Sequence, residues 1–164
     1  MKDDERAFTG LITAFEDSSL SKPQTNKMLL QPRKTKYKKA RKGRIQDYDI
    51  SAKSLNHGSI GLIATKSAYL HASQIEAARR TINRHLKRKG KVWTCVFPDL
   101  GVTKKPTQVR IGKGCGGSVK YWAYRLRPGR ILFEVDGVDY ESAVTALKSG
   151  ASKLPYGVKL HTRT

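Results

Sequence analysis

The segment 28–44, MLLQPRKTKYKKARKGR, constrains the fold of this chain because it cannot bury a hydrophobic core of its own. It holds eight Lys or Arg among seventeen residues, no acidic residue, and one aromatic residue, Tyr37. A segment with so little apolar surface cannot offset the entropy that folding would cost it. We therefore expect the folded part of the chain to lie after residue 44.

The spacing of charge in this segment suits a polyanion. An extended chain advances by about 3.3 Å per residue, close to the phosphate repeat of a nucleic acid strand. Pro32 favours an extended start, and Tyr37 offers a flat ring on which a base could stack. By charge alone, a solvated basic tail or a membrane-surface patch competes with this interpretation.

The residue order resembles the N-terminus of the L-sixteen family of large-subunit ribosomal proteins. The similarity comprises Gln31-Pro32, Thr35-Lys36, Lys38-Lys39 and Lys42-Gly43-Arg44, with an extra Leu at 29 or 30 and the Arg33-Lys34 order as departures. Bacterial members begin where Met28 stands, so the resemblance implies that residues 1–27 are an extension. It also implies that the tail binds rRNA through its cations and its aromatic ring: Arg33, Lys34, Lys36, Tyr37, Lys38, Lys39, Arg41, Lys42 and Arg44.

The bulk composition agrees with an anionic partner. The 164 residues carry 33 Lys or Arg and 13 Asp or Glu, a formal charge of +20. The excess lies after residue 27, because residues 1–27 hold five acids and four bases. Two cysteines exclude a disulfide scaffold, and no window approaches the roughly 20 apolar residues of a membrane span. Acidic residues near Met1 argue against a secretory or transit signal.

Residues 1–27 allow two interpretations. Apolar residues at helical spacing predict a short amphipathic helix over 6–17, which would dock on a neighbouring molecule. A partly disordered leader is an equal alternative. Residues 18–26 then form a linker.

Residues 45–164 predict a single α+β domain with a mainly antiparallel sheet and two packed helices, preceded by the basic extended tail. We expect helices over 72–89 and 140–154, each with one apolar stripe. We expect strands over 58–64, 92–97, 108–111, 119–126, 131–135 and 158–160. The turn 127–130 predicts that the two strands beside it form a hairpin.

The helix over 72–89 has one strongly basic face. Ordinary solvated helices mix charges of both signs, whereas Glu76 is the single acid here, so we favour an RNA-facing helix. Ser73 and Glu76 predict a capping box, although the resemblance starts the helix nearer His71, and Gly90 predicts its C-cap. Residues 74–80, QIEAARR, match the family's signature. The cations expected to bind rRNA are Arg79, Arg80, Arg84, Lys87, Arg88 and, just after the helix, Lys91.

The glycine-rich segment 111–118, IGKGCGGS, allows close backbone approach to an anion. It is not a nucleotide-binding P-loop, because Lys113 is followed by Gly114 and not by Ser or Thr. A flexible glycine hairpin is the plain alternative. The preceding loop, 98–106, adds two more lysines.

These loops carry the strongest resemblance to the family, in which they lie on rRNA close to the bound tRNA. The resemblance implies the same contacts here for Lys104, Lys105, Arg110, Gly112, Lys113 and Gly114. Cys95 and Cys115 depart from the family, which usually has Arg and Lys there. The second departure would weaken one expected phosphate contact at the tip of the loop.

Other chemistries lack the residues they need. The four histidines and two cysteines show no zinc spacing, so we expect no metal and no cofactor. Cys95 is expected to be a buried hydrophobe. Glu134 and Asp136 are the one paired-carboxylate candidate, and nearby Arg127 and Arg130 offer salt bridges instead. We expect no enzymatic activity and no small-molecule substrate.

The resemblance thus implies a structural constituent of the large ribosomal subunit, which binds large-subunit rRNA and helps to position tRNA near the peptidyl-transferase region during translation. Its expected partners are large-subunit rRNA, tRNA and neighbouring ribosomal proteins, without a membrane. We expect a mitochondrial member first, with a plastid or bacterial origin as alternatives. A free RNA-binding module or RNA chaperone is the rival function, and an enzyme acting on nucleic acid lacks an acid–base or metal cluster.

Overall fold

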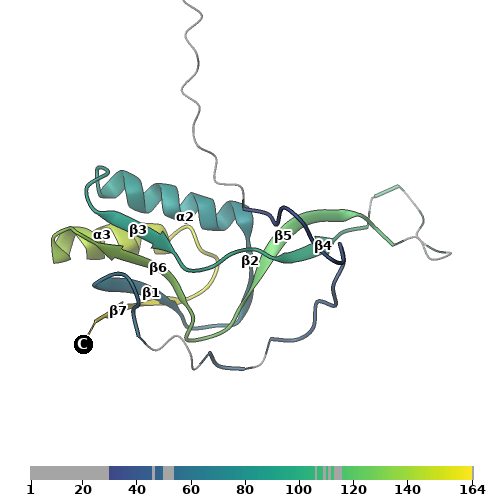
Figure 1. The fold of residues 1–164 in the computed structure, drawn as a ribbon, viewed down its shortest axis with the longest axis horizontal. Helices are drawn as coiled ribbons and strands as arrows, with labels where there is room; N and C mark the ends of the chain where they lie inside the picture. The colour runs from purple at the N-terminus through teal and green to yellow at the C-terminus, as the bar shows by residue number, and fades with distance from the viewer. Residues whose placement is uncertain are drawn as a thin grey trace, which may run out of the picture.

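A computed structural model describes residues 30–45, 47–49, 54–105, 107–108, 110, 112 and 116–163. The expected helix over 6–17 and the linker over 18–26 lie outside the described residues. Within them, two antiparallel sheets and two helices confirm the α+β class (Figure 1). Neither of these helices is long and apolar enough to cross a membrane.

The first sheet has four strands in the order β3-β6-β1-β7, all antiparallel. β6 (Ile131–Asp136) lies inside this sheet, and five of its six residues are buried. It pairs with β3 (Lys91–Thr94) on one side and β1 (Ile60–Ala64) on the other. β7 (Val158–Thr162) forms the far edge.

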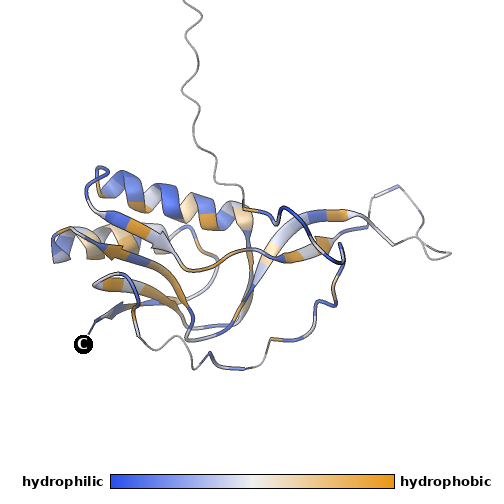
Figure 2. Ribbon diagram, in the orientation of Figure 1, coloured by the Kyte–Doolittle hydropathy of each residue, from blue (hydrophilic) through white to orange (hydrophobic). Residues whose placement is uncertain are grey.

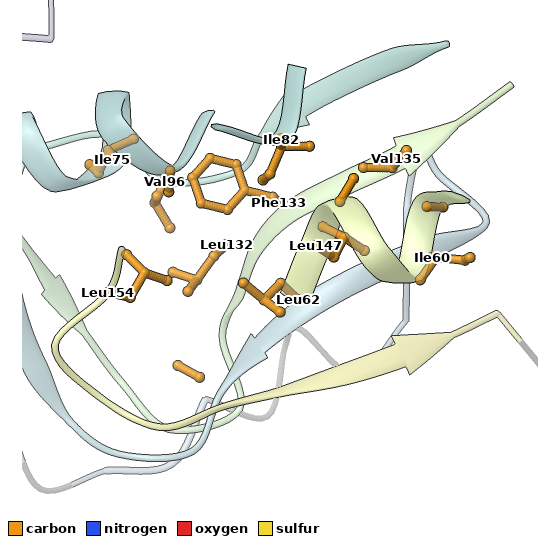
Figure 3. Close-up of a cluster of buried hydrophobic side chains, with 14 of the residues drawn as sticks. Ile60, Leu62, Ile75, Ile82, Val96, Leu132, Phe133, Val135, Leu147 and Leu154 are labelled. Carbon is orange, nitrogen blue, oxygen red and sulfur yellow. The ribbon is translucent and has the colours of Figure 1, made fainter. Parts of the chain in front are cut away.

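Two helices pack together and against this sheet. The apolar stripes of α2 (Ala72–His85) and α3 (Tyr140–Ala151) meet Phe133 and Val135 of β6 in the main core (Figure 3). The helices cross closely at Gly150, where an added Cβ would lie 2.5 Å from Ile82 Cγ1. The 3.6-residue period therefore placed both buried stripes correctly. Figure 2 shows the other consequence, long hydrophilic stretches on α2 and hydrophobic residues along β1 and β6.

The second sheet has three strands in the order β2-β5-β4 and extends away from the helix pair (Figure 1). Its centre is β5 (Val119–Leu126), with the bounds that the alternating pattern predicted. β2 (Ala68–His71) and β4 (Leu100–Thr103) pair with it on either side. The sequence interpretation missed both short strands, and it placed 100–103 in a loop.

The predicted hairpin across 127–130 is wrong. β5 and β6 belong to different sheets, although the turn between them exists. One bond closes the turn itself, from the Arg130 N–H to the Arg127 carbonyl. The others go elsewhere: the Gly129 N–H donates to Ala64, the Ala64 N–H to Arg130, and the Asp49 N–H to Pro128. A turn signal fixes a change of direction, whereas long-range pairing decides which strands become neighbours.

Other expected boundaries differ too: β1 begins at Ile60 instead of residue 58, and β7 ends at Thr162 instead of residue 160. The expected strand over 108–111 is absent from the described residues of that range, Gln108 and Arg110, which are irregular. The strand expected over 92–97 ends at Thr94. The helix expected over 140–154 ends at Ala151, although Leu154 still reaches the core.

Candidate nucleic-acid interface

The start of α2 is fixed by His71 and not by the predicted capping box of Ser73 and Glu76. His71 Nδ1 accepts from the Ser73 N–H at 3.1 Å, and the Gln74 side chain accepts from the His71 N–H at 3.0 Å. The helix therefore begins where the family resemblance placed it. Glu76 lies two residues beyond Gln74, the position that closes the box, so its carboxylate is available for other contacts.

The end of α2 also differs from the prediction. Leu86 is the C-cap, and the helix stops before the expected Gly90. Lys87 and Arg88 follow with φ of 49° and 62°, a left-handed conformation uncommon for residues with side chains. Their N–H groups still bond to helix carbonyls of Arg84 and Asn83, which satisfies the helix terminus. The tight turn moves these two cations off the line of the helix.

A basic groove of about 470 Å³ runs along α2 and this turn. Five of the cations predicted from the sequence line it, together with one amide: Arg79, Arg80, Asn83, Arg84, Lys87 and Arg88. Lys91, the sixth predicted member, lies on β3, where its Nζ is 5.2 Å from the Trp93 ring centroid. The helical period thus identified the groove but not the position of Lys91.

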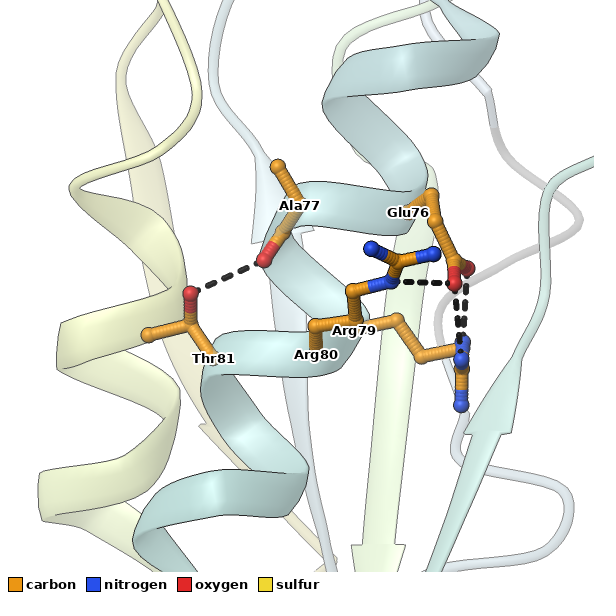
Figure 4. Close-up of polar contacts among 5 residues, drawn as sticks. All are labelled: Glu76, Ala77, Arg79, Arg80 and Thr81. Carbon is orange, nitrogen blue, oxygen red and sulfur yellow. Dashed lines mark hydrogen bonds and ion pairs between the residues drawn. The ribbon is translucent and has the colours of Figure 1, made fainter. Parts of the chain in front are cut away.

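Glu76 partly neutralises this groove (Figure 4). Its carboxylate accepts two 2.8 Å hydrogen bonds from Arg79 and one 2.8 Å bond from Arg80 Nε. The bonds from Arg79, more than those from Arg80, lower the pKa of Glu76 to about 2. Glu76 therefore holds two arginines in place and leaves Arg84, Lys87 and Arg88 as the less engaged cations of the groove.

The basic tail lies against the second sheet. Tyr69 of β2 donates its hydroxyl to the carbonyls of Lys42 and Gly43, and Arg125 of β5 donates to the Arg41 carbonyl. A Cβ at Gly101 of β4 would lie 2.8 Å from the Lys38 carbonyl, so the tail passes directly over that strand. The domain thus holds this part of the tail by its backbone oxygens.

Anchoring by backbone leaves the tail's charged side chains outward. Residues 33–44 are all exposed, and Tyr37 exposes 74% of its surface. Lys36 Nζ stands 5.7 Å from the Tyr37 ring centroid and Lys42 Nζ 4.6 Å from that of Tyr69. An exposed ring between exposed cations can take both a base and its phosphates.

The glycine-rich loop is described only in part. Lys104, Lys105, Arg110 and Gly112 are exposed, whereas Lys113, Gly114 and Cys115 lie outside the described residues. At its base, a Cβ on Gly117 would lie 3.1 Å from the Lys104 carbonyl, and one on Gly116 would lie 3.0 Å from Lys39 Nζ. The structure therefore brings the middle of the tail to the base of this loop.

The predicted RNA-binding residues form two separate regions. The tail and the loop meet along the second sheet, while the groove follows α2 toward its C-terminal turn. Figure 1 places that turn and the far end of the β4–β5 pair at opposite ends of the long axis. Any single partner of both regions must therefore span the length of the domain.

Glu134 and Asp136 of β6, the candidate carboxylate pair, lie in different environments. Glu134 is 1% exposed, and its carboxylate accepts from the N–H groups of Asn56 (3.4 Å), His57 (2.6 Å) and Gly58 (2.8 Å). These bonds lower its pKa against the opposing effect of burial. Asp136 is exposed. The expected salt bridges from Arg127 and Arg130 form instead with Asp47 (3.8 Å) and Asp49 (3.4 Å).

Cys95 is only partly buried, contrary to its prediction as a core hydrophobe. Its Sγ lies 3.4 Å from Glu134 Oε1, and burial with this carboxylate raises the pKa of Cys95 to about 12. A thiol held neutral in this way is a poor nucleophile. Among the described residues, no group of three or more His, Cys, Asp or Glu could hold a metal ion.

The sequence interpretation missed three functional side chains. Tyr69 and Arg125 were not connected with the tail, because contacts with backbone oxygens leave no pairing pattern in a sequence. His57 was not connected with Trp93, although their rings stack with centroids 5.8 Å apart. Trp93, an aromatic residue two positions after Lys91 and half-buried in the structure, was the one available signal.

Comparison with known proteins agrees with the resemblance noted from the sequence. Residues 32–161 match the model of a family described as Ribosomal protein L16p/L10e. A protein named Large ribosomal subunit protein uL16 from Erythrobacter litoralis is 54% identical over 135 residues, covering 82% of this chain and 93% of the relative. Proteins of the same name from Cereibacter sphaeroides and Maricaulis maris are 53% and 51% identical, each covering 82% of this chain and 98% of the relative.

Proposed function

The chain belongs to the ribosomal protein L16p/L10e family, and from this we propose that it is a structural, non-enzymatic constituent of the large ribosomal subunit. The observation that carries the proposal is the extent of the family match. Residues 32–161 include most of the tail, the basic groove and the glycine-rich loop. Its expected partners are large-subunit rRNA and neighbouring ribosomal proteins.

Two features of the geometry support rRNA as the principal ligand. The tail exposes every side chain from Arg33 to Arg44, and the groove on α2 gathers five cations around one depression. Neither surface is apolar, so binding would be driven mainly by release of counterions from phosphates. Affinity should therefore fall steeply with salt concentration.

A role beside tRNA is the finer part of the proposal. The residues that would carry it are the exposed Lys104, Lys105, Arg110 and Gly112, with Lys113 and Gly114 beyond the described part of the loop. The loop joins β4 to β5 of the second sheet, and a backbone of small residues could follow a phosphate chain closely. Binding of tRNA at this loop is our proposal and follows from the family resemblance.

The organisms of the relatives indicate which type of ribosome this chain belongs to. Those reported above come from bacteria, and they do not support the mitochondrial origin expected from the sequence. We propose a bacterial type of large subunit in the bacterial cytoplasm, with an organelle ribosome of bacterial ancestry as the alternative setting.

The decisive test is the position of the chain in a sucrose gradient of native lysate, measured by quantitative mass spectrometry at low salt and after a high-salt wash. We expect it to comigrate with the large subunit, at equal stoichiometry to that subunit's other proteins. A peak near the top of the gradient at low salt would contradict the proposal and favour a free RNA-binding module.

A binding measurement then tests which surface acts. Removing two tail cations by K38Q and K39Q should lower the salt dependence of rRNA-fragment binding by about one to two units of log–log slope. K148Q with K153Q removes the same charge from the exposed end of α3 and is the matched control. Equal losses in both double variants would show that net charge, and not the tail, determines binding.

A further inference from the structure

A cavity on the face of the first sheet that the helices leave uncovered is the strongest feature not used above. It has a volume of about 300 Å³ and lies between the loop 54–57 and strands β3 and β6. Its lining mixes two aromatic rings with polar side chains: Ser54, Asn56, His57, Trp93, Thr94, Cys95, Arg130, Ile131 and Glu134. This volume is at the lower end of the range of about 300–1,000 Å³ for small-molecule sites.

Trp93 is directed into this face by the register of the sheet. Trp93 stands directly opposite Glu134 in the β3–β6 ladder, and opposite residues of an antiparallel pair point to the same face. The adjacent pair, Val92 and Val135, points the other way and joins the helix-covered core. Trp93 thus lies at a sheet edge with its ring outside that core.

Glu134 fixes the loop that forms one side of the cavity. By accepting from three consecutive N–H groups, its carboxylate fixes the loop that carries His57. Gly58 allows this close approach, because a Cβ there would lie 2.7 Å from the Val135 carbonyl oxygen. The His57 ring is consequently held nearly parallel to Trp93, at an interplanar angle of 18°.

The charges around these rings indicate the class of ligand. Lys91 Nζ stands 5.2 Å from the Trp93 ring centroid, where it could also reach a phosphate. Arg130 lines the cavity, and within the described part of the chain its buried Nε finds no hydrogen-bond acceptor. Flat rings, a cation beside them and hydrogen-bonding groups behind them are what an unstacked base requires.

We propose that the His57–Trp93 cavity binds an unpaired nucleobase of the RNA partner. This inference rests on the proposed rRNA-binding function and adds to it a site for a single base, separate from the tail, the groove and the loop. The base would stack on the aromatic pair and present its polar edge to Asn56 and Arg130. Lys91 would hold the neighbouring phosphate.

The test uses the full chain and the fluorescence of Trp93. W122F removes the second tryptophan of the chain, so the remaining emission reports on the cavity alone. A dye-labelled adenosine decamer is titrated in parallel with a blunt ten-base-pair RNA duplex, and anisotropy reports total binding of each. We expect the decamer to quench Trp93 and the duplex to leave its emission unchanged.

Two variants test whether quenching of Trp93 and affinity for the decamer depend on the same cavity. H57A should weaken decamer binding by about 5- to 150-fold, which corresponds to a stacking contribution of about 1–3 kcal/mol. C95M should weaken it too, by filling the cavity without changing charge. Binding of the duplex should stay within twofold, and Y140A, which removes an exposed ring on α3, should alter neither ligand.

The outcomes separate this inference from the proposed function. Decamer binding without any change in Trp93 emission, or with equal affinity in H57A, overturns the base site and leaves the rRNA-binding proposal intact. Absence of an anisotropy change with either RNA overturns both. Quenching that H57A abolishes while duplex binding persists supports the site.

Discussion

The two cationic regions of this protein are held by opposite means. The cations of α2 extend from a helix whose other side is fixed in the core, so packing sets their positions. The tail has no core residue between Arg33 and Arg44 and is held by its carbonyl groups. A core positions side chains through their own helix or strand, whereas anchoring by backbone leaves each side chain of the tail free to follow its ligand.

The largest expected effect comes from separating the helices. G150V would place a side chain within 2.5 Å of Ile82 Cγ1, in a site where Ile82 is fully buried. Overpacking of this kind costs typically about 1–3 kcal/mol of unfolding free energy. We expect chemical denaturation to show this loss. In the G150V protein we also expect RNA binding by the α2 groove to weaken more than RNA binding by the tail.

The matched control is G112A, because among the described residues no atom lies within 4 Å of a Cβ at Gly112. It should leave the unfolding midpoint within the error of the measurement. A G150V protein with unchanged stability would show that α2 and α3 are not rigidly packed, and the contrast between groove and tail would lose its basis.

A smaller effect is expected from Glu76, which restrains the groove electrostatically. Its folded pKa of about 2 lies below the ordinary value of 4.5, so its contribution to stability is complete above pH 4.5 and disappears as pH falls toward 2. E76Q should therefore lower the free energy of unfolding by about 1 kcal/mol at pH 7, and this loss should shrink as pH falls through the folded pKa of about 2. Denaturation curves at both pH values measure this difference.

E76Q also tests how much the α2 groove contributes to RNA binding. Releasing Arg79 and Arg80 should steepen the salt dependence of RNA binding by about one to two units, because two more cations can meet phosphates. E141Q removes an exposed acid from the first turn of α3 and should leave the slope unchanged. If E76Q also leaves it unchanged, the two arginines already reach RNA while bound to Glu76.

The smallest effect is expected from the anchor of the tail. Y69F removes the hydroxyl that donates to Lys42 and Gly43 but keeps the ring beside Lys42. Unfolding free energy should change by less than about 0.5 kcal/mol, since the bond is at the surface. RNA affinity should fall by roughly threefold to tenfold, because a loosened tail loses entropy on binding.

Y140F supplies the control, an exposed tyrosine on α3 that loses the same atom. Isothermal titration at fixed salt would measure both variants. A Y69F protein with wild-type affinity would indicate that the tail binds RNA equally well without its anchor, and preorganisation would then contribute nothing.

The sequence predicted the parts of the site that depend on residues close together in the chain, and it missed those that depend on residues far apart. Helical period located Arg79, Arg80 and Arg84, since α2 is one continuous element, although the residues that cap both of its ends were misplaced. The hairpin failed because the partners of β5 and β6 lie far away in the chain. His57 and Trp93 are similarly distant, and a buried carboxylate on a third segment brings them together.

The sequence by itself determined the α+β class, the two buried helix stripes and the presence of a basic tail that cannot form a core. Those properties follow from composition and local period, which act within about a dozen residues. Only the tertiary structure decided that the strands form two sheets, that the tail lies along one of them, and that a cavity opens on the other. These depend on the register of distant segments and on backbone hydrogen bonds between them. Every residue type except proline can both donate and accept such bonds, so they leave no residue pattern to recognise.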